Sequence, residues 1–158
     1  MSREAVVAHL DALGVRYEVV ECDPDFADTA RFCERYGYSM EASANAICVV
    51  GKSAERPMAC CVVLASTRLD VNGVVRRRLG TRKASFADAG STVERTGMMI
   101  GGVTPFGLPA GLPVMECDQV IVGGGSRDCK ILCPPASLLA VEGAEVVDDL
   151  AKTPPPQA

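Results

Sequence analysis

The chain has 158 residues, of which 48% are hydrophobic and 23% are charged, and its mean hydropathy is +0.17. This length and composition predict one folded domain with a substantial core and exclude a disordered chain, which lacks the apolar surface to offset its ordering entropy. No apolar stretch reaches the roughly 18 residues of a transmembrane helix, and the charged, amphipathic start at Met1 lacks a signal-peptide core. A soluble, cytoplasmic protein is therefore expected.

The charge balance is mildly acidic, with 16 Lys and Arg against 20 Asp and Glu and a net charge of -4. This balance excludes a protein that binds nucleic acid through a uniformly basic surface, although a local basic patch remains compatible with it. With 4 Phe, 3 Tyr and no Trp, the chain is also poor in the rings that stack on single-stranded bases.

The cysteine content is high, at 8 residues, but no two cysteines form a C-x-x-C pair. A chain of this length builds a core without disulfides, and His9 is the only histidine that could complete a mixed zinc site. Neither a disulfide framework nor a metal centre is predicted, and His9 is interpreted as a surface or boundary residue. Cys48, Cys60 and Cys61 lie in apolar runs, where a free cysteine behaves as a small hydrophobic residue.

Helix and strand patterns alternate along the chain. In the first half of the chain, the sequence predicts a helix from Ser2 to Gly14, a strand at 17–22, a helix at 28–36, and strands at 46–50 and 58–64. In the second half, it predicts helices at 70–79 and 86–96 and strands at 119–122 and 128–133. A short helix is expected after Pro134-Pro135, and the final segment, AEVVDDL, is expected to close or flank the sheet. Capping residues such as Asp28, and glycines such as Gly37, mark the helix ends.

The strands at 46–50 and 58–64 are separated by the turn signal GKSAERP and are expected to form an antiparallel hairpin. We therefore predict a single α+β domain in which helices flank a curved, mixed and mostly antiparallel β-sheet. The domain is expected to span residues 1–152, and residues 153–158 (TPPPQA) to form a disordered, proline-rich tail.

A loop rich in glycine and proline follows the helix predicted at 86–96, with the sequence Gly101-Gly102-Val103-Thr104-Pro105-Phe106-Gly107. Paired glycines let the backbone approach a ligand closely, and proline fixes the turn. Successive N–H groups in such a loop can form an anion-binding nest or an oxyanion hole, although an ordinary turn has the same composition. A second glycine run, GGGSRDCK at 123–130, lacks the ending of a phosphate-binding loop and opens a strand, which favours a hairpin turn.

In its context, the segment IGGVTPFGLP resembles the GxxxP loop of the YbaK and prolyl-tRNA-synthetase-associated editing-domain family. SANAICVVG resembles the family's first central strand, the segment from LASTRLD to VERTG resembles its helix, short strand and helix, and VIVGGGSRDCKI resembles its late hairpin. The resemblance covers nearly the whole chain, from Ala5 to Leu150. It implies a free-standing aminoacyl-tRNA deacylase that clears mischarged tRNA and needs no metal or other cofactor. Its implied partners are mischarged aminoacyl-tRNA and an aminoacyl-tRNA synthetase, with no membrane.

The resemblance also assigns site residues by position. The catalytic loop corresponds to Gly101, Gly102, Val103, Thr104 and Pro105, whose backbone amides would hold the ester carbonyl and the terminal ribose while a ribose hydroxyl helps to activate water. Substrate binding falls to Asn45, Ala46, Phe106 and Gly107.

Two positions depart from the family pattern. Ala46 stands where the family commonly has a lysine, and strand alternation points Asn45 to the opposite face unless a bulge turns it inward. The segment after the loop is shorter than in the family, so that Glu116 or Asp118 stands in for the family's acidic residue.

Basic residues gather at Arg76, Arg77, Arg78, Arg82 and Lys83. Such a run is commonly a solvated helix face, but in an editing domain Arg76, Arg78, Arg82 and Lys83 become candidates for contacts with tRNA phosphates. Three functions stay open: a deacylase for a small or thiol-bearing amino acid, a catalytically weakened member that binds tRNA or a protein partner, and a hydrolase of another small acyl ester.

Overall fold

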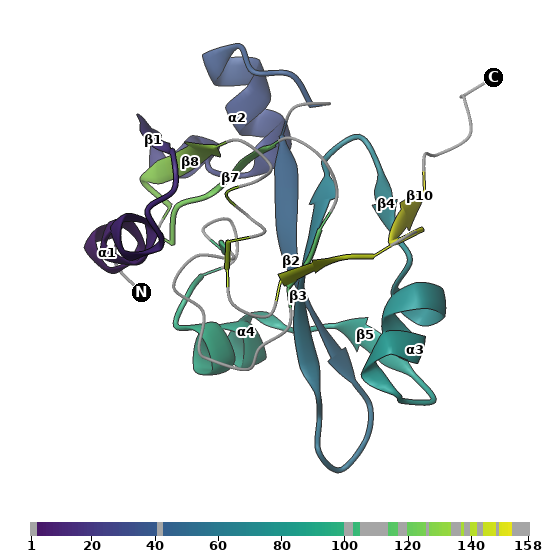
Figure 1. The fold of residues 1–158 in the computed structure, drawn as a ribbon. Helices are drawn as coiled ribbons and strands as arrows, with labels where there is room; N and C mark the ends of the chain where they lie inside the picture. The colour runs from purple at the N-terminus through teal and green to yellow at the C-terminus, as the bar shows by residue number, and fades with distance from the viewer. Residues whose placement is uncertain are drawn as a thin grey trace, which may run out of the picture.

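Figure 1 shows the fold in the computed structural model of the chain. The residues that the structure describes are 3–40, 43–99, 103–104, 114–116, 120–125, 127–133, 137, 140–141, 144–147 and 149–152. The helical segments are α1 (Arg3–Leu13), the 3-10 turn η1 (Pro24–Phe26), α2 (Thr29–Tyr36), the π-helical turn η2 (Val71–Val75), α3 (Arg76–Leu79) and α4 (Ala89–Thr96). The strands are β1 (Glu18–Glu21), β2 (Ala44–Gly51), β3 (Met58–Leu64), β4 (Arg68–Leu69), β5 (Ala84–Phe86), β6 (Val114–Glu116), β7 (Val120–Gly123), β8 (Cys129–Cys133), β9 (Ala144–Val146) and β10 (Ala151–Lys152).

The described strands form a mixed, mostly antiparallel arrangement, which confirms the predicted α+β class. The central five-stranded sheet has the order β5-β2-β3-β6-β9, in which β6 runs parallel to both β3 and β9. The AEVVDDL segment thus contributes β9 to the edge of this sheet. A three-stranded antiparallel sheet, β1-β8-β7, and a β4–β10 pair stand apart from it, so the strands are divided among sheets rather than joined in one.

The predicted hairpin of β2 and β3 forms the centre of the molecule, in unbroken register from Ala44 opposite Leu64 to Val50 opposite Met58. Both faces of this hairpin are covered, which explains why its strands are continuous apolar runs. Cys48 and Cys60 pack on one face with Leu10 of α1, and Val49 packs on the other with Val75 of η2. In Figure 1, α1 and the three-stranded sheet lie to one side of the hairpin and α3 lies to the other.

Cys48, Cys60 and Cys61 are buried free thiols, in agreement with their interpretation as small core residues. Burial raises the pKa of Cys61 to about 12. A thiol with so high a pKa carries almost no thiolate at neutral pH, so Cys61 is inert as a nucleophile.

The start of α4 corrects the sequence interpretation. The helix was predicted from Phe86, but Phe86 is the last residue of β5 and pairs with Val49. The helix begins only at Ala89, because the side chain of Asp88 accepts a hydrogen bond from the Ser91 N–H at 2.7 Å and caps the first turn. The non-local pairing with β2 therefore takes Phe86 away from the helix.

The predicted helix at 70–79 is also irregular, because it consists of the π-helical turn η2 followed by the short helix α3. Asp70 caps it, accepting a hydrogen bond from the Gly73 N–H at 3.0 Å. Asp28 stands at the N-cap of α2 as predicted, but its side chain makes no capping hydrogen bond and pairs instead with Arg127 at 3.6 Å. Gly37, Gly80 and Gly97 end α2, α3 and α4 in the left-handed conformation.

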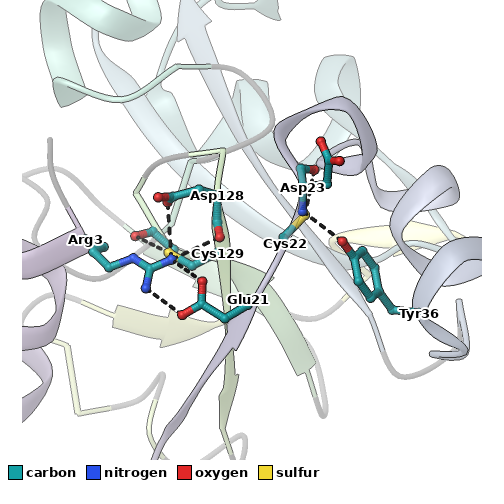
Figure 2. A network of polar contacts seen from close by, with 8 residues as sticks. Arg3, Glu21, Cys22, Asp23, Tyr36, Asp128 and Cys129 are labelled. Atoms are coloured by element: carbon teal, nitrogen blue, oxygen red, sulfur yellow. Dashed lines mark hydrogen bonds and ion pairs between the residues drawn. The ribbon is translucent and has the colours of Figure 1, made fainter.

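A network of hydrogen bonds connects α1 to the three-stranded sheet, as Figure 2 shows. The guanidinium of Arg3 donates to both carboxylate oxygens of Glu21, at 2.7 and 2.9 Å, and to the carbonyl oxygen of Asp128 at 3.0 Å. The hydrogen bonds from Arg3 lower the pKa of the Glu21 carboxyl group. The N-terminal helix is thereby held to β1 and to the turn before β8.

Several sequence predictions fall on residues outside the described ranges, namely the Ser2 cap, most of the short helix after Pro134-Pro135, and the tail at 153–158. Within the described part of the chain, no helix combines the length and the apolarity needed to cross a membrane.

Candidate functional site

A cleft of about 400 Å³ lies at the N-terminal end of β2, beside the start of α2. Its wall is formed by Asp28, Thr29, Ala30, Met40, Ala44, Asn45, Ala46, Ile47, Val103 and Lys130. These residues come from four separate segments of the sequence: the start of α2, the beginning of β2, the glycine- and proline-rich loop, and β8.

The pairing of β2 explains where the cleft opens. The partner strand β5 pairs only with Val49, Val50 and Gly51, whereas β3 pairs along the strand from Ala44. The stretch from Ala44 to Ile47 consequently has one edge that no described strand covers. The N-terminal turn of α2 approaches this edge, where the Thr29 hydroxyl donates a hydrogen bond to Asn45 Oδ1 at 2.5 Å.

Asn45 and Ala46, two of the predicted substrate-binding residues, both lie in the wall of this cleft. The unbroken β2–β3 register contains no bulge at Asn45. Ala46 packs against the core cluster of Cys48 and Met98. Asn45 reaches the cleft nonetheless, because its side chain extends at the strand edge toward Thr29.

The loop residues Val103 and Thr104 are the described part of the predicted catalytic loop. Val103 is buried and lines the cleft. Thr104 is fully buried, its N–H lies 3.4 Å from Met98 Sδ, and its hydroxyl has no hydrogen-bond partner among the described residues. The remaining predicted loop residues, Gly101, Gly102, Pro105, Phe106 and Gly107, lie outside the described ranges.

Lys130 enters the cleft from β8 and was not identified as a site residue from the sequence. Only 6% of its surface is exposed. Its ammonium group donates to the carbonyl oxygen of Ala27 at 2.6 Å and lies 5.5 Å from the centre of the Phe32 ring. Burial lowers the pKa of Lys130 below its usual value of 10.5. The available signal was a lysine at the second position of an otherwise apolar strand, CKILC, where a charge is costly to bury.

The basic cluster lies apart from the cleft, because α3 and β5 are far from α2 in the fold (Figure 1). Arg78, Arg82 and Lys83 are exposed. Arg76 is half-buried and donates to the carbonyl oxygens of Asn72 and Thr81, at 2.8 and 3.2 Å, so its guanidinium supports the helix end. The structure thus separates Arg76 from the exposed members of the predicted phosphate-binding set.

Of the two candidates for the family's acidic residue, one lies within the described residues. Glu116 ends β6, opposite Val146 of β9, and Asp118 lies outside the described residues. His9 is half-buried on α1. No group of three or more His, Cys, Asp or Glu side chains suited to a metal ion occurs among the described residues.

Solved structures share this fold over almost the whole chain. The protein APE2540 matches with a TM-score of 0.81 and 22% identity, over 94% of this chain and 99% of that one. A candidate trans-editing enzyme for prolyl-tRNA synthetase matches with a TM-score of 0.78 and 25% identity, over 94% and 97% of the two chains. A scaffold used for epitope backbone grafting matches with a TM-score of 0.77 and 24% identity, again over 94% and 97%.

These matches define the fold of the protein as an α+β domain shared with these structures. Residues 23–139 match the model of the aminoacyl-tRNA editing domain family. The chain belongs to this family, as the resemblance of its loop and strands predicts.

Proposed function

We propose that this protein is a trans-acting aminoacyl-tRNA deacylase that hydrolyses the ester of mischarged tRNA in the cleft at the start of β2. The observation that carries the proposal is the meeting of Val103 and Asn45, from the predicted loop and the predicted strand, in one cleft of an editing-family chain. The similarity to a candidate trans-editing enzyme for prolyl-tRNA synthetase supports the same reaction.

The cleft suits a small substrate side chain. Its volume of about 400 Å³ is near the lower end of small-molecule sites, which span roughly 300–1,000 Å³. Ala44, Ala46 and Val103 give it small apolar walls, and Asn45 adds an amide that can hydrogen-bond to the ester or the ribose. We infer that the amino acid removed from the tRNA is small or thiol-bearing, since a larger side chain would compete with the terminal adenosine for space in the cleft.

In the proposed reaction, water adds to the carbonyl carbon of the aminoacyl ester, and negative charge develops on the carbonyl oxygen. Backbone N–H groups of the loop Gly101–Pro105 stabilise this charge, as in other oxyanion holes. The neighbouring ribose hydroxyl helps to take the proton from water. The bond between the carbonyl carbon and the ribose oxygen then breaks, the ribose oxygen gains a proton, and the products are the free amino acid and a deacylated tRNA.

A basic patch outside the cleft would bind the tRNA backbone. Arg78, Arg82 and Lys83 are exposed cations on an acidic chain and are our candidates for phosphate contacts. The proposal takes residues 1–152 as the editing domain and the cytoplasm as its compartment, with an aminoacyl-tRNA synthetase as a second partner.

The test is a deacylation screen across tRNAs charged with non-cognate amino acids, run with and without excess chelator. We expect hydrolysis above the buffer rate for at least one small or thiol-bearing amino acid, and the same rate with chelator because the loop mechanism uses no metal. Loss of activity in chelator and recovery with zinc would contradict the loop mechanism. No hydrolysis of any substrate would contradict the deacylase function.

A second candidate function is favoured by Ala46, whose methyl group cannot donate a hydrogen bond or carry a charge. A catalytically weakened member would bind tRNA or a protein partner without turnover. Binding of aminoacyl-tRNA without hydrolysis in the same screen would support this candidate over the deacylase.

A further inference from the structure

We propose that a pocket at the tip of the β2–β3 hairpin binds one unpaired nucleotide of the substrate tRNA, with the base on the Phe86 ring and the phosphate at Lys52 and Arg56. The inference rests on the proposed deacylase function and adds to it an RNA contact outside the cleft. The observation that carries it is an exposed aromatic ring, two cations and three serine hydroxyls around one pocket of about 490 Å³. This hairpin-tip pocket lies at the end of the hairpin away from α2 (Figure 1).

The hairpin-tip pocket and the cleft lie along the same edge of β2. β5 pairs with residues 49–51 at the edge that is open over residues 44–47, and the pocket forms around Val50 and Gly51. At about 3.4 Å per residue, Asn45 in the cleft wall and Val50 in the pocket wall are about 17 Å apart. A few unpaired nucleotides span that distance, so one RNA strand can reach both sites.

Phe86 presents its ring to solvent in the wall of this pocket. It is the last residue of β5, paired with Val49, and 59% of its surface is exposed. The next residue, Ala87, donates its N–H to the carbonyl oxygen of Cys48 at 2.9 Å, so the backbone around Phe86 is held to β2. Among the described residues, no ring or cation stacks on Phe86. A ring that is fixed in place and left uncovered is a platform on which a base can stack.

Lys52 and Lys83 place positive charge at one side of the pocket. The Lys52 N–H donates to the carbonyl oxygen of Lys83 at 2.8 Å, which joins the β2–β3 turn to the segment before β5. Both side chains are exposed, and no described residue forms an ion pair with either. Since Lys83 is one of the candidates for phosphate contacts, the hairpin-tip pocket is continuous with that basic patch.

Arg56 has an unfavourable backbone conformation at another side of the pocket. Its φ of 46° lies in the left-handed region, which is costly for a residue with a Cβ. The guanidinium of Arg95 on α4 donates to the Arg56 carbonyl oxygen at 3.2 Å and stabilises this conformation. The Arg56 guanidinium lies 3.5 Å from the Ser91 hydroxyl in the pocket wall. Backbone strain of this kind is commonly retained at ligand-binding sites, which supports a binding role for Arg56.

The carboxylates near the pocket have partners of their own. Asp88, the one acid among the described lining residues, accepts a hydrogen bond from the Ser91 N–H at 2.7 Å at the start of α4. Glu55, in the β2–β3 turn, accepts one from the Ser53 hydroxyl at 3.1 Å. The three cations named above outnumber these two carboxylates, so the surroundings of the pocket are positive although the chain is acidic.

An unpaired nucleotide is the ligand whose chemistry matches the ring, the cations and the hydroxyls together. Its base stacks on an aromatic ring, its phosphate pairs with Lys or Arg, and its ribose hydroxyl bonds to serine hydroxyls. A free phosphate or a run of carboxylates uses the cations but leaves the ring uncovered. The substrate of the proposed reaction carries such nucleotides next to its ester.

The first experiment uses fluorescence, because the chain contains no Trp. Phe86→Trp places the only indole of the protein in the pocket, and Ala8→Trp places one on the exposed face of α1 as the control. Each variant is titrated with an RNA hairpin that carries the unpaired 3′ end of a tRNA, and with the same hairpin lacking those nucleotides. A glutamate decapeptide tests an acidic protein segment as the ligand.

We expect the hairpin with the unpaired end to quench the fluorescence of Phe86→Trp, because a base stacks on the indole, and to leave Ala8→Trp unchanged. The shortened hairpin and the peptide should quench neither variant. Equal quenching by both hairpins would assign the pocket to phosphates of the duplex, and quenching by the peptide would assign it to an acidic protein. Either result, or no quenching at all, would overturn the inference.

The second experiment measures the affinity of the hairpin with the unpaired end, with melting temperatures to confirm folding. Phe86→Ala should weaken binding about tenfold, within the range for the loss of one stacked base. Met99→Ala, which removes an equally exposed side chain outside the pocket lining, should bind as the wild type does. Lys52→Gln should lower the slope of log affinity against log salt by about 0.7, the value for one phosphate of a single strand.

The outcomes separate the inference from the proposed function. If the wild type hydrolyses aminoacyl-tRNA and folded Phe86→Ala binds the hairpin as tightly as the wild type, the RNA site is overturned while the deacylase function stands. If the wild type hydrolyses no aminoacyl-tRNA but Phe86→Ala loses affinity for the hairpin, the RNA site is supported and the deacylase function fails.

Discussion

Asn45 connects the two elements that meet at the cleft. Its side-chain oxygen accepts a hydrogen bond from Thr29 at the start of α2, and the amide nitrogen of Asn45 is the donor that we propose for the substrate. Strand alternation alone predicts that Asn45 and Ala46 point to opposite faces. That rule describes the direction of Cβ, and it could not reveal that β5 stops at Val49 and leaves an open strand edge.

The pair of Thr29 and Asn45 is testable by a double-mutant cycle. Thr29→Val removes the hydroxyl with little change of shape, and we expect it to cost about 1 kcal/mol of stability and a few-fold in rate. Asn45→Ala should lower the rate further, since it also removes the amide donor. The double variant should be little worse than Asn45→Ala alone, because the two residues act through one contact. Additive losses in rate would contradict the positioning of Asn45 by Thr29.

The loop residue Gly102 gives a second prediction at the same scale. Gly102→Ala adds a Cβ where the ester should approach and restricts the backbone angles of the loop. We expect hydrolysis to slow by about a hundredfold, with an unchanged melting temperature. A folded variant with wild-type turnover would show that the loop is not the oxyanion site.

The turn between β7 and β8 depends on a close contact between Gly124 and Cys129, the residue that precedes Lys130. Gly124 packs against Cys129, such that a Cβ at position 124 would meet Cys129 Sγ and lie 2.9 Å from the Cys129 carbonyl oxygen. The glycine run was correctly interpreted as a hairpin turn rather than a phosphate loop. The close approach between Gly124 and Cys129 explains why a glycine is required there.

We therefore expect Gly124→Ala to destabilise the protein by about 1–3 kcal/mol, the usual cost of overpacking. The matched control is Gly90→Ala in α4, where an added Cβ would lie 3.5 Å from an Asp88 oxygen, an ordinary contact. Thermal unfolding of both variants measures the difference. Equal melting temperatures for Gly124→Ala and the wild type would contradict the packing at this turn.

The elements differ in how well local sequence predicts them. The β2–β3 hairpin and the glycine-terminated helices follow from short-range signals and were located closely. The boundary at Phe86, the division into separate sheets and the parallel pairing of β6 with β3 depend on contacts between distant segments. No local periodicity encodes such pairings, so the sequence alone could not establish them.

On the scale of the whole molecule, α2, which borders the cleft, and α3, which begins the basic cluster, lie in different parts of the fold (Figure 1). Because the net charge of the chain is negative, most of its surface would repel tRNA phosphates, and contact with tRNA would require a local basic patch. The patch is defined here by the exposed residues Arg78, Arg82 and Lys83. Arg76 is the weakest member of the predicted set, because its guanidinium already donates to two backbone carbonyls.

Salt dependence of tRNA binding tests this patch. Arg82→Gln should weaken all tRNAs alike and reduce the slope of log affinity against log salt by about one unit, as loss of one phosphate contact does. Arg16→Gln, an exposed arginine just after α1, is the matched control and should leave the slope unchanged. Equal slopes for Arg82→Gln and the wild type would assign the cluster to solvated surface.

The central claim is that ester hydrolysis takes place in the cleft at the start of β2, and filling the cleft tests it most directly. Ala30 is exposed on α2 and lines the cleft, whereas Ala8 is exposed on α1 and does not. We predict that Ala30→Trp slows single-turnover hydrolysis of the susceptible aminoacyl-tRNA at least tenfold, because the indole occupies the space of the substrate. Ala8→Trp should hydrolyse it at the wild-type rate. A folded Ala30→Trp protein that matches the wild type would contradict the assignment of the reaction to this cleft.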